Sequence, residues 1–166
     1  MVLDCDPQDL AFTWSDGMPT LIGFEDFHFS TSYSGGKMAV ACSDVAIGID
    51  LELTATEPSD QDVADNLFHP RELNQLHQTP DADWATVFYS IWTQKEALAK
   101  ALGTGFGIEF SNFCVSAKGG LIESELTETE NLRWYSQAVT IADGYVLAIA
   151  CPQPIEQLSI EQFQDV

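Results

Sequence analysis

The segment that most constrains the fold is residues 47–53, in which every second residue is apolar. Successive side chains of an extended chain point to opposite faces. The segment therefore predicts a strand with one face in the core, formed by Ile47, Ile49, Leu51 and Leu53. Its other face carries Gly48, Asp50 and Glu52, and the glycine has no side chain to block the approach of another group.

Two carboxylates on one face of a strand leave two interpretations open. Like charges this close are costly on a half-buried strand unless a cation lies between them. Asp50 and Glu52 belong either to the acidic outer face of a half-exposed strand or to a metal site. The second interpretation requires further ligands from elsewhere in the chain.

A long helix is expected over residues 81–102. Asp81 follows Pro80 as a plausible N-cap, and Gly103 is a typical helix end. An apolar stripe is formed by Phe88, Ile91, Leu98 and Leu102. On a neighbouring face, Trp92, Glu96 and Lys100 follow one another at intervals of four residues. Glu96 and Lys100 form either a helix-stabilising ion pair or part of a functional site.

The rest of the chain predicts an α+β fold, with an antiparallel sheet packed against this one long helix. Short helices are expected near residues 59–67 and 70–76, and a Ser- and Gly-rich loop at residues 29–36. We expect one hairpin between a buried strand at 37–44 and residues 47–53, and another between 132–139 and 145–151. The polar tail from residue 152 is expected to fray.

Composition narrows the functional class. The chain has 26 acidic and 6 basic residues, a formal net charge of -20, which argues against partners such as nucleic acid or an anionic membrane surface. The first residues lack the features of a signal peptide, and no apolar run reaches transmembrane length, so we expect a cytoplasmic protein. Three cysteines in apolar runs are expected to be buried free thiols: Cys42, Cys114 and Cys151. We expect His69 and His77 to be exposed and not to bind metal.

Together the strand and the helix predict one site. Asp50, Glu52 and Glu96 offer three hard oxygen ligands, which suit Mg²⁺. Lys100, one helical turn from Glu96, would neutralise phosphate charge or donate a proton to a leaving group. The loop at residues 32–36 would hold the far end of a phosphorylated ligand. A diphosphate substrate and phosphoryl transfer fit this set of groups.

Two motifs resemble those of the 4′-phosphopantetheinyl transferases. Residues 48–52, Gly-Ile-Asp-Leu-Glu, are similar to the family motif G-(I/V)-D-(I/L)-E, and residues 92–101 are similar to W-x-x-K-E-A-x-x-K-A. Residues 29–35 resemble the family loop F-(N/S)-x-S-H-S-G, with Tyr33 in place of its histidine. Met18 replaces the lysine of a G-K-P motif. The resemblance covers residues ~10–150.

The resemblance implies a phosphopantetheinyl transferase-like fold in a single domain of residues 1–166. Residues 1–44 would be the shortened first half of the larger, pseudo-dimeric (Sfp-type) members, 45–151 the core with the metal motifs, and 152–166 a tail. The family transfers 4′-phosphopantetheine from coenzyme A to a serine of an apo acyl or peptidyl carrier protein and releases 3′,5′-ADP. A homo-oligomer, in which one protomer completes the coenzyme A pocket of another, is also expected.

The resemblance also implies roles for individual residues. Asp50, Glu52 and Glu96 would hold Mg²⁺ on the diphosphate of coenzyme A, and Glu96 and Lys100 would be catalytic. Coenzyme A would be bound by Ser32, Tyr33, Lys95 and Lys100. The alternative is a degenerate homologue that binds a carrier protein or a synthase without efficient transfer. A third possibility is a Mg²⁺-dependent enzyme that uses another diphosphate substrate.

Overall fold

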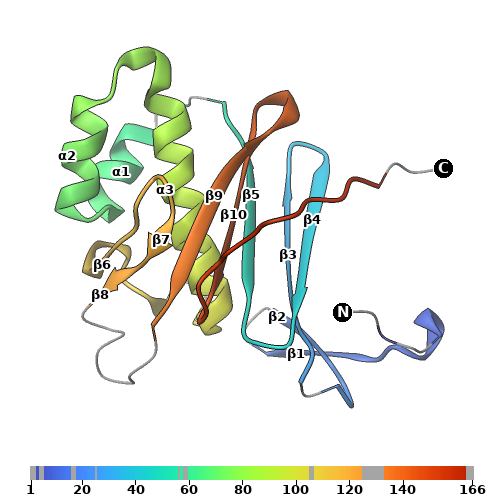
Figure 1. Cartoon of the computed structure of the whole chain (residues 1–166). Coiled ribbons are helices and arrows are strands. Elements are labelled where there is room, and N and C mark those ends of the chain that lie inside the picture. The colour runs from blue at the N-terminus through green and yellow to red at the C-terminus, as the bar shows by residue number, and fades with distance from the viewer. Residues whose placement is uncertain are drawn as a thin grey trace.

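The computed structural model describes residues 3, 6–15, 18–24, 26–55, 57, 60–104, 107–124 and 133–163. Three helices, α1 (Asp60–Leu67), α2 (Pro70–Gln78) and α3 (Asp81–Leu102), lie to one side of an antiparallel sheet (Figure 1). The sheet has the order β5-β10-β9-β7. Its strands are β5 (Gly48–Leu53), β10 (Tyr145–Cys151), β9 (Tyr135–Ile141) and β7 (Gly120–Leu121). The predicted α+β class, with one long helix on an antiparallel sheet, is confirmed.

Three two-stranded pairs accompany this sheet. They are β1 (Phe12–Ser15) with β2 (Met18–Leu21), β3 (His28–Ser34) with β4 (Lys37–Ser43), and β6 (Phe113–Cys114) with β8 (Glu123–Ser124). Short 3₁₀ turns occur at Pro7–Asp9, Phe110–Asn112 and Ala142–Gly144. In Figure 1 the β3–β4 pair stands beside β5, on the side of the sheet away from the helices.

One expected hairpin is confirmed and the other is wrong. β9 and β10 pair in register, with Ala138 opposite Ala148. β4, however, pairs with β3 and not with β5. Gly35 and Gly36 allow this because both have positive φ, +55° and +84°, and so close a tight turn between β3 and β4. The loop predicted at residues 29–36 is therefore mostly strand, because β3 runs from His28 to Ser34.

The helix α3 begins and ends close to its predicted bounds. Gly103 adopts the left-handed conformation, with φ 71°, and its N–H donates to the carbonyls of Ala99 and Lys100. Pro80 takes the N-cap position, so Asp81 is the first helical residue and not the cap. Asp81 and Asp83 in the first turn stabilise the helix, because their negative charges lie near the positive end of the helix dipole.

Apolar side chains cover both faces of the sheet. One face packs against the helices. The other buries Ile49, Leu51, Tyr145, Leu147 and Ile149. Ile155 and Leu158, in the C-terminal segment, pack against this second cluster as the segment crosses back over the sheet (Figure 1). The expectation that the tail frays from residue 152 is therefore wrong for this part, because its few apolar residues have a surface to cover.

Strand β5 is buried on both faces from Gly48 to Leu51, so the expected half-exposed acidic face is wrong for Asp50, although Glu52 is half-buried. Leu53, which was expected in the core, is 38% exposed at the end of the strand. Asp50 has only 4% of its surface exposed. The reason is the close approach of α3 to Gly48. A Cβ atom at Gly48 would lie 1.8 Å from the carbonyl oxygen of Ala97 and 2.7 Å from the backbone nitrogen of Ala101. Only glycine fits here, and it admits the helix backbone.

The expected exposure of the cysteines and histidines is confirmed only in part. Cys42 is exposed on β4, whereas Cys114 and Cys151 are half-buried, so the prediction of three buried thiols is wrong. His77 is exposed as expected. His69 is half-buried because its side chain caps α2 by accepting a hydrogen bond from the N–H of Arg71. Among the described residues, no helix combines the length and the apolar character needed to cross a membrane.

Replacing Gly48 by alanine should destabilise the fold by roughly 3 kcal/mol, because the new methyl group would overlap the backbone of α3. Urea unfolding followed by circular dichroism measures the change. Gly107→Ala is the control, since a Cβ there meets nothing within 4 Å. A Gly48→Ala variant as stable as this control would contradict the close contact of β5 and α3.

Candidate functional site

The site lies where β5 meets α3. Lys100, in the last turn of α3, places its ammonium nitrogen Nζ 2.7 Å from Oδ1 of Asp50. The same nitrogen donates to the carbonyl oxygen of Ile49 at 3.1 Å. The structure thus brings together one residue from each of the two segments that the sequence singled out.

Glu96 precedes Lys100 by one helical turn and is half-buried. Burial raises the pKa of Glu96 to about 7, and the charges of Asp50 and Glu52 add to the increase, while Lys100 opposes it. Burial also raises the pKa of Glu52, although the hydrogen bond from Ser34 lowers it. The three carboxylates therefore influence one another electrostatically, and Lys100 is the cation that opposes them.

One oxygen of Asp50 has a place for a further partner. Oδ2 of Asp50 is buried and has no hydrogen-bond partner. A buried carboxylate oxygen without a donor is costly, and a cation beside it would remove that cost. The oxygen chemistry of Asp50, Glu52 and Glu96 also fits a hard divalent cation such as Mg²⁺. The unpartnered oxygen of Asp50 and the chemistry of the three carboxylates therefore fit a metal ion.

The side chains are not yet arranged as a complete metal site. Within the ranges that the structure describes, no three His, Cys, Asp or Glu side chains lie close enough together to hold a metal ion. Lys100 instead neutralises part of the charge by holding Oδ1 of Asp50.

The serines of β3 contact the carboxylates of β5. The hydroxyl of Ser32 donates to Oδ1 of Asp50 at 2.9 Å, and that of Ser34 donates to Oε2 of Glu52 at 2.8 Å. Ser32 was expected at the phosphate end of a ligand, but in this structure its hydroxyl is held by a carboxylate. Tyr33 points to the opposite face of β3, with 71% of its surface exposed. Ser32 and Tyr33 therefore do not face one pocket.

Lys95 lies in the core and not in the site. It is fully buried, and its ammonium nitrogen is 2.9 Å from Oε2 of Glu72. The same nitrogen donates to the carbonyl oxygens of Phe110 and Phe113 at 2.6 Å and 2.8 Å. The expectation that Lys95 binds coenzyme A is corrected, because its charge is fully used inside the protein.

Glu72 is the matching buried anion on α2. Its two oxygens accept hydrogen bonds from the backbone N–H groups of Val115 and His69, both at 2.8 Å. Burial raises the pKa of Glu72 and lowers the pKa of Lys95, and the charge of each partner opposes the shift of the other. This pair ties α2, α3 and the segment after α3 together behind the site.

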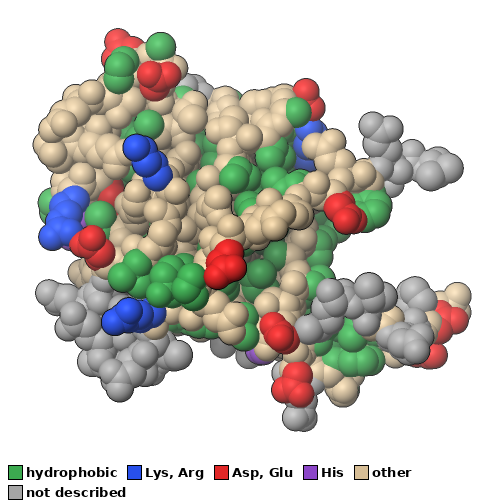
Figure 2. Space-filling model, in the orientation of Figure 1, with side chains coloured by type: hydrophobic (Ala, Val, Ile, Leu, Met, Phe, Trp, Pro, Cys, Tyr) green, Lys and Arg blue, Asp and Glu red, His purple; other side chains and the backbone are tan. Residues whose placement is uncertain are grey.

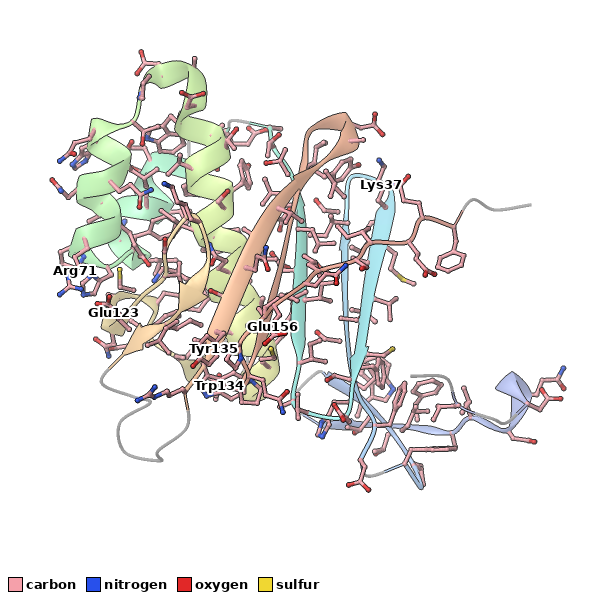
Figure 3. All side chains as sticks on the ribbon, in the orientation of Figure 1. Lys37, Arg71, Glu123, Trp134, Tyr135 and Glu156 are labelled. Atoms are coloured by element: carbon pink, nitrogen blue, oxygen red, sulfur yellow. The ribbon has the colours of Figure 1, made fainter. Side chains whose placement is uncertain are left out.

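Other basic residues are paired elsewhere on the surface. Lys37 bonds to Asp143 at 2.7 Å, and Arg71 is paired with Glu123. Figure 3 shows Lys37 at the tip of the β3–β4 pair and Arg71 beside Glu123 near the helices. On the face seen in Figure 2 the basic side chains lie apart from one another, so this face has no broad basic patch.

Sequence reasoning missed the role of Ser34 and the Lys95–Glu72 pair. The serines could have been recognised, since Ser30, Ser32 and Ser34 alternate along the chain as on one face of a strand. Helical spacing could also have identified Lys95 as the buried lysine, since it follows Ile91 by four residues and precedes Leu98 by three, within the apolar stripe. The Gly17, Gly105 and Phe106 positions noted in the motifs lie outside the described residues.

Comparison with known proteins places this geometry in context. A family model described as the 4′-phosphopantetheinyl transferase superfamily matches residues 46–150. The slr0495 protein of Synechocystis sp. is 36% identical over 107 residues, which are 62% of this chain and 44% of that protein. The 4′-phosphopantetheinyl transferase psf-1 of Bacillus pumilus is 32% identical over 101 residues, which cover 61% of this chain and 42% of the relative.

Two further similarities cover a similar share of this chain. The 4′-phosphopantetheinyl transferase HetI of Nostoc sp. is 38% identical over 110 residues, 63% of this chain and 42% of the relative. The crystal structure of Thermotoga maritima holo-(acyl-carrier-protein) synthase is similar with a TM-score of 0.44 and 19% identity, covering 64% of this chain and 61% of that one. The matched part of this chain thus spans less than half the length of these curated relatives.

Breaking the buried pair should destabilise the protein strongly. Lys95→Met or Glu72→Gln should each cost about 3–5 kcal/mol, because each leaves a buried partner uncompensated. The double variant should cost less than the sum of the two by at least ~1 kcal/mol. Urea unfolding of the four proteins measures this coupling.

The exposed pair provides the control. Arg71→Met removes a surface ion pair, whose side chains are 68% and 65% exposed, and should cost less than ~1 kcal/mol. Lys95→Met and Arg71→Met variants of equal stability would contradict the buried position of Lys95.

Proposed function

The chain belongs to the 4′-phosphopantetheinyl transferase superfamily, and we propose that it moves 4′-phosphopantetheine from coenzyme A to a serine of an apo acyl or peptidyl carrier protein. The second product is 3′,5′-ADP. The observation that carries the proposal is the contact of Lys100 with Asp50, 2.7 Å long, beside Glu96. It joins the two motifs of the family at one point.

Asp50, Glu52 and Glu96 would hold Mg²⁺. A bound Mg²⁺ supplies charge neutralisation on the diphosphate of coenzyme A and makes its phosphorus more electrophilic. The buried, unpartnered Oδ2 of Asp50 supports this assignment. So does the electrostatic coupling of the three carboxylates, which disfavours keeping all of them ionised without an added cation.

Glu96 would accept the proton of the attacking serine, directly or through a water molecule. The ionised carboxylate of Glu96 can accept a proton, and it lies one helical turn from Lys100 in the helix motif. The serine oxygen then bonds to the β-phosphorus of coenzyme A, and the bond from that phosphorus to the bridging oxygen breaks. The electron pair of that bond leaves with 3′,5′-ADP.

Lys100 would stabilise or protonate the leaving phosphate. Its ammonium nitrogen already lies between the two elements of the site, and it has three protons to donate. Binding of a phosphate would compete with Asp50 for this ammonium group. Tyr33, exposed on the outer face of β3, would contact the nucleotide end of coenzyme A.

One observation favours the alternative, a homologue that binds a carrier protein without efficient transfer. In the part of the chain that the structure describes, the acidic side chains do not yet gather as three metal ligands. The retained Asp50, Glu52, Glu96 and Lys100 favour the transferase, because a binding module has no need of this set.

Transfer should be visible by mass spectrometry. The chain, coenzyme A, Mg²⁺ and several apo carrier proteins are incubated together, and one carrier should gain ~340 Da, the mass of the phosphopantetheine group. EDTA should abolish the addition, and excess Mg²⁺ should restore it. Carrier binding without any addition, with every carrier tested, would favour the alternative.

Two substitutions test the carboxylates of the site. Asp50→Ala should abolish Mg²⁺-dependent binding of coenzyme A, measured by calorimetry, because it removes the buried unpartnered oxygen. Glu96→Gln should lower kcat by at least ~100-fold, since the amide cannot accept the serine proton. Glu109→Gln, at an exposed loop residue outside the site, is the control and should change neither. Unchanged binding by Asp50→Ala would show that the site is misassigned.

A further inference from the structure

The serines of β3 form a regular series along one face. Ser30, Ser32 and Ser34 pair across the hairpin with Ala41, Ala39 and Lys37 of β4. Their side chains point toward β5, whereas the intervening Thr31 and Tyr33 are exposed on the other face. Three hydroxyls thus face the strand that carries the carboxylates.

These hydroxyls take the place of a backbone ladder. In the described sheets, β5 pairs through its backbone with β10, and β3 pairs with β4. On the other edge of β5, the N–H of Ile49 donates to Oγ of Ser30 at 3.1 Å, and the N–H of Leu53 donates to Oγ of Ser34 at 3.2 Å. A hydroxyl that accepts from a backbone N–H still has its own proton to donate.

That proton goes to a site carboxylate. Ser34 accepts from Leu53 and donates to Oε2 of Glu52 at 2.8 Å. Ser32 donates to Oδ1 of Asp50 at 2.9 Å. Each hydrogen bond holds one oxygen of a carboxylate in place. The other oxygen of that carboxylate then faces a different direction.

For Asp50 the consequence is specific. Oδ1 receives two donors, Ser32 and the ammonium of Lys100, while Oδ2 receives none and is buried. The two oxygens of one carboxylate are therefore divided between the protein and a place for a ligand. The bond from Ser32 maintains this division even when Lys100 leaves to meet a phosphate.

We propose that Ser32 and Ser34 are positioning residues, which orient Asp50 and Glu52 toward a divalent cation. The inference rests on the proposed function only for the identity of the metal-binding face. Residues that hydrogen-bond to metal ligands typically change metal affinity by 10–100-fold when they are lost. Ser32 should have the larger effect, because Asp50 is buried and Glu52 is half-exposed.

The test uses Mn²⁺ binding, measured by calorimetry on the full chain without coenzyme A. Ser32→Ala should raise the Kd for Mn²⁺ about 10-fold or more, and Ser34→Ala should raise it less. Ser32→Thr, which keeps the hydroxyl, should retain most of the affinity. Thr31→Val is the matched control, since it removes a hydroxyl from the exposed face of the same strand.

A second measurement separates positioning from phosphate binding. In EDTA, the affinity for coenzyme A should be the same in Ser32→Ala and the wild type. A loss of that affinity with unchanged Mn²⁺ binding would overturn the inference and make Ser32 a phosphate contact. If Ser32→Ala does not fold by circular dichroism, Ser34→Ala decides the outcome by the same two measurements.

The outcomes also distinguish this inference from the proposed function. A wild-type chain that binds Mn²⁺ but transfers nothing would contradict the proposed function, while weaker Mn²⁺ binding by Ser32→Ala would still support the inference. Intact transfer and unchanged Mn²⁺ affinity in both serine variants would overturn the inference alone. A wild-type chain that binds no Mn²⁺ would overturn both.

Discussion

The contact between Gly48 and the backbone of α3 is the constraint on which the site depends. A side chain at this position would overlap the carbonyl of Ala97, so glycine sets the distance between β5 and the helix. Once the helix lies this close, Lys100 of its last turn can reach Asp50 and the carbonyl of Ile49. The first residue of the strand motif is thus structural, and it makes the chemistry of the following residues possible.

Close packing also explains the electrostatics of the site. Burial makes negative charge expensive, and the elevated pKa of Glu96, about 7, reflects burial first and the neighbouring carboxylates second. Lys100 offsets part of this cost by pairing with Asp50. Lys100 therefore has two compatible roles. In this structure it offsets the negative charge of the carboxylates, and in the proposed reaction it would offset the negative charge of a phosphate. A metal ion would then offset the electrostatic repulsion among the three carboxylates.

The two lysines of the helix motif show how one element serves fold and function at once. Lys95 and Lys100 are five residues apart, and they leave α3 in different directions. Lys95 enters the core, where Glu72 and two backbone carbonyls surround it, and Lys100 enters the site. A buried ion pair adds little net stability compared with apolar residues, but it fixes a geometry, because either charge alone is poorly tolerated.

The sequence by itself determined the elements that local rules govern. Alternation of apolar residues defined β5, and the caps and apolar stripe defined α3 to within a residue. The spacing of Asp50, Glu52, Glu96 and Lys100 predicted a site for a metal ion and a phosphate group, and this stays a prediction. Only the tertiary structure decided that β4 pairs with β3, and that Asp50 is buried although it lies on the polar face of β5. These features depend on contacts between distant segments, and a residue's own sequence neighbours carry no information about them.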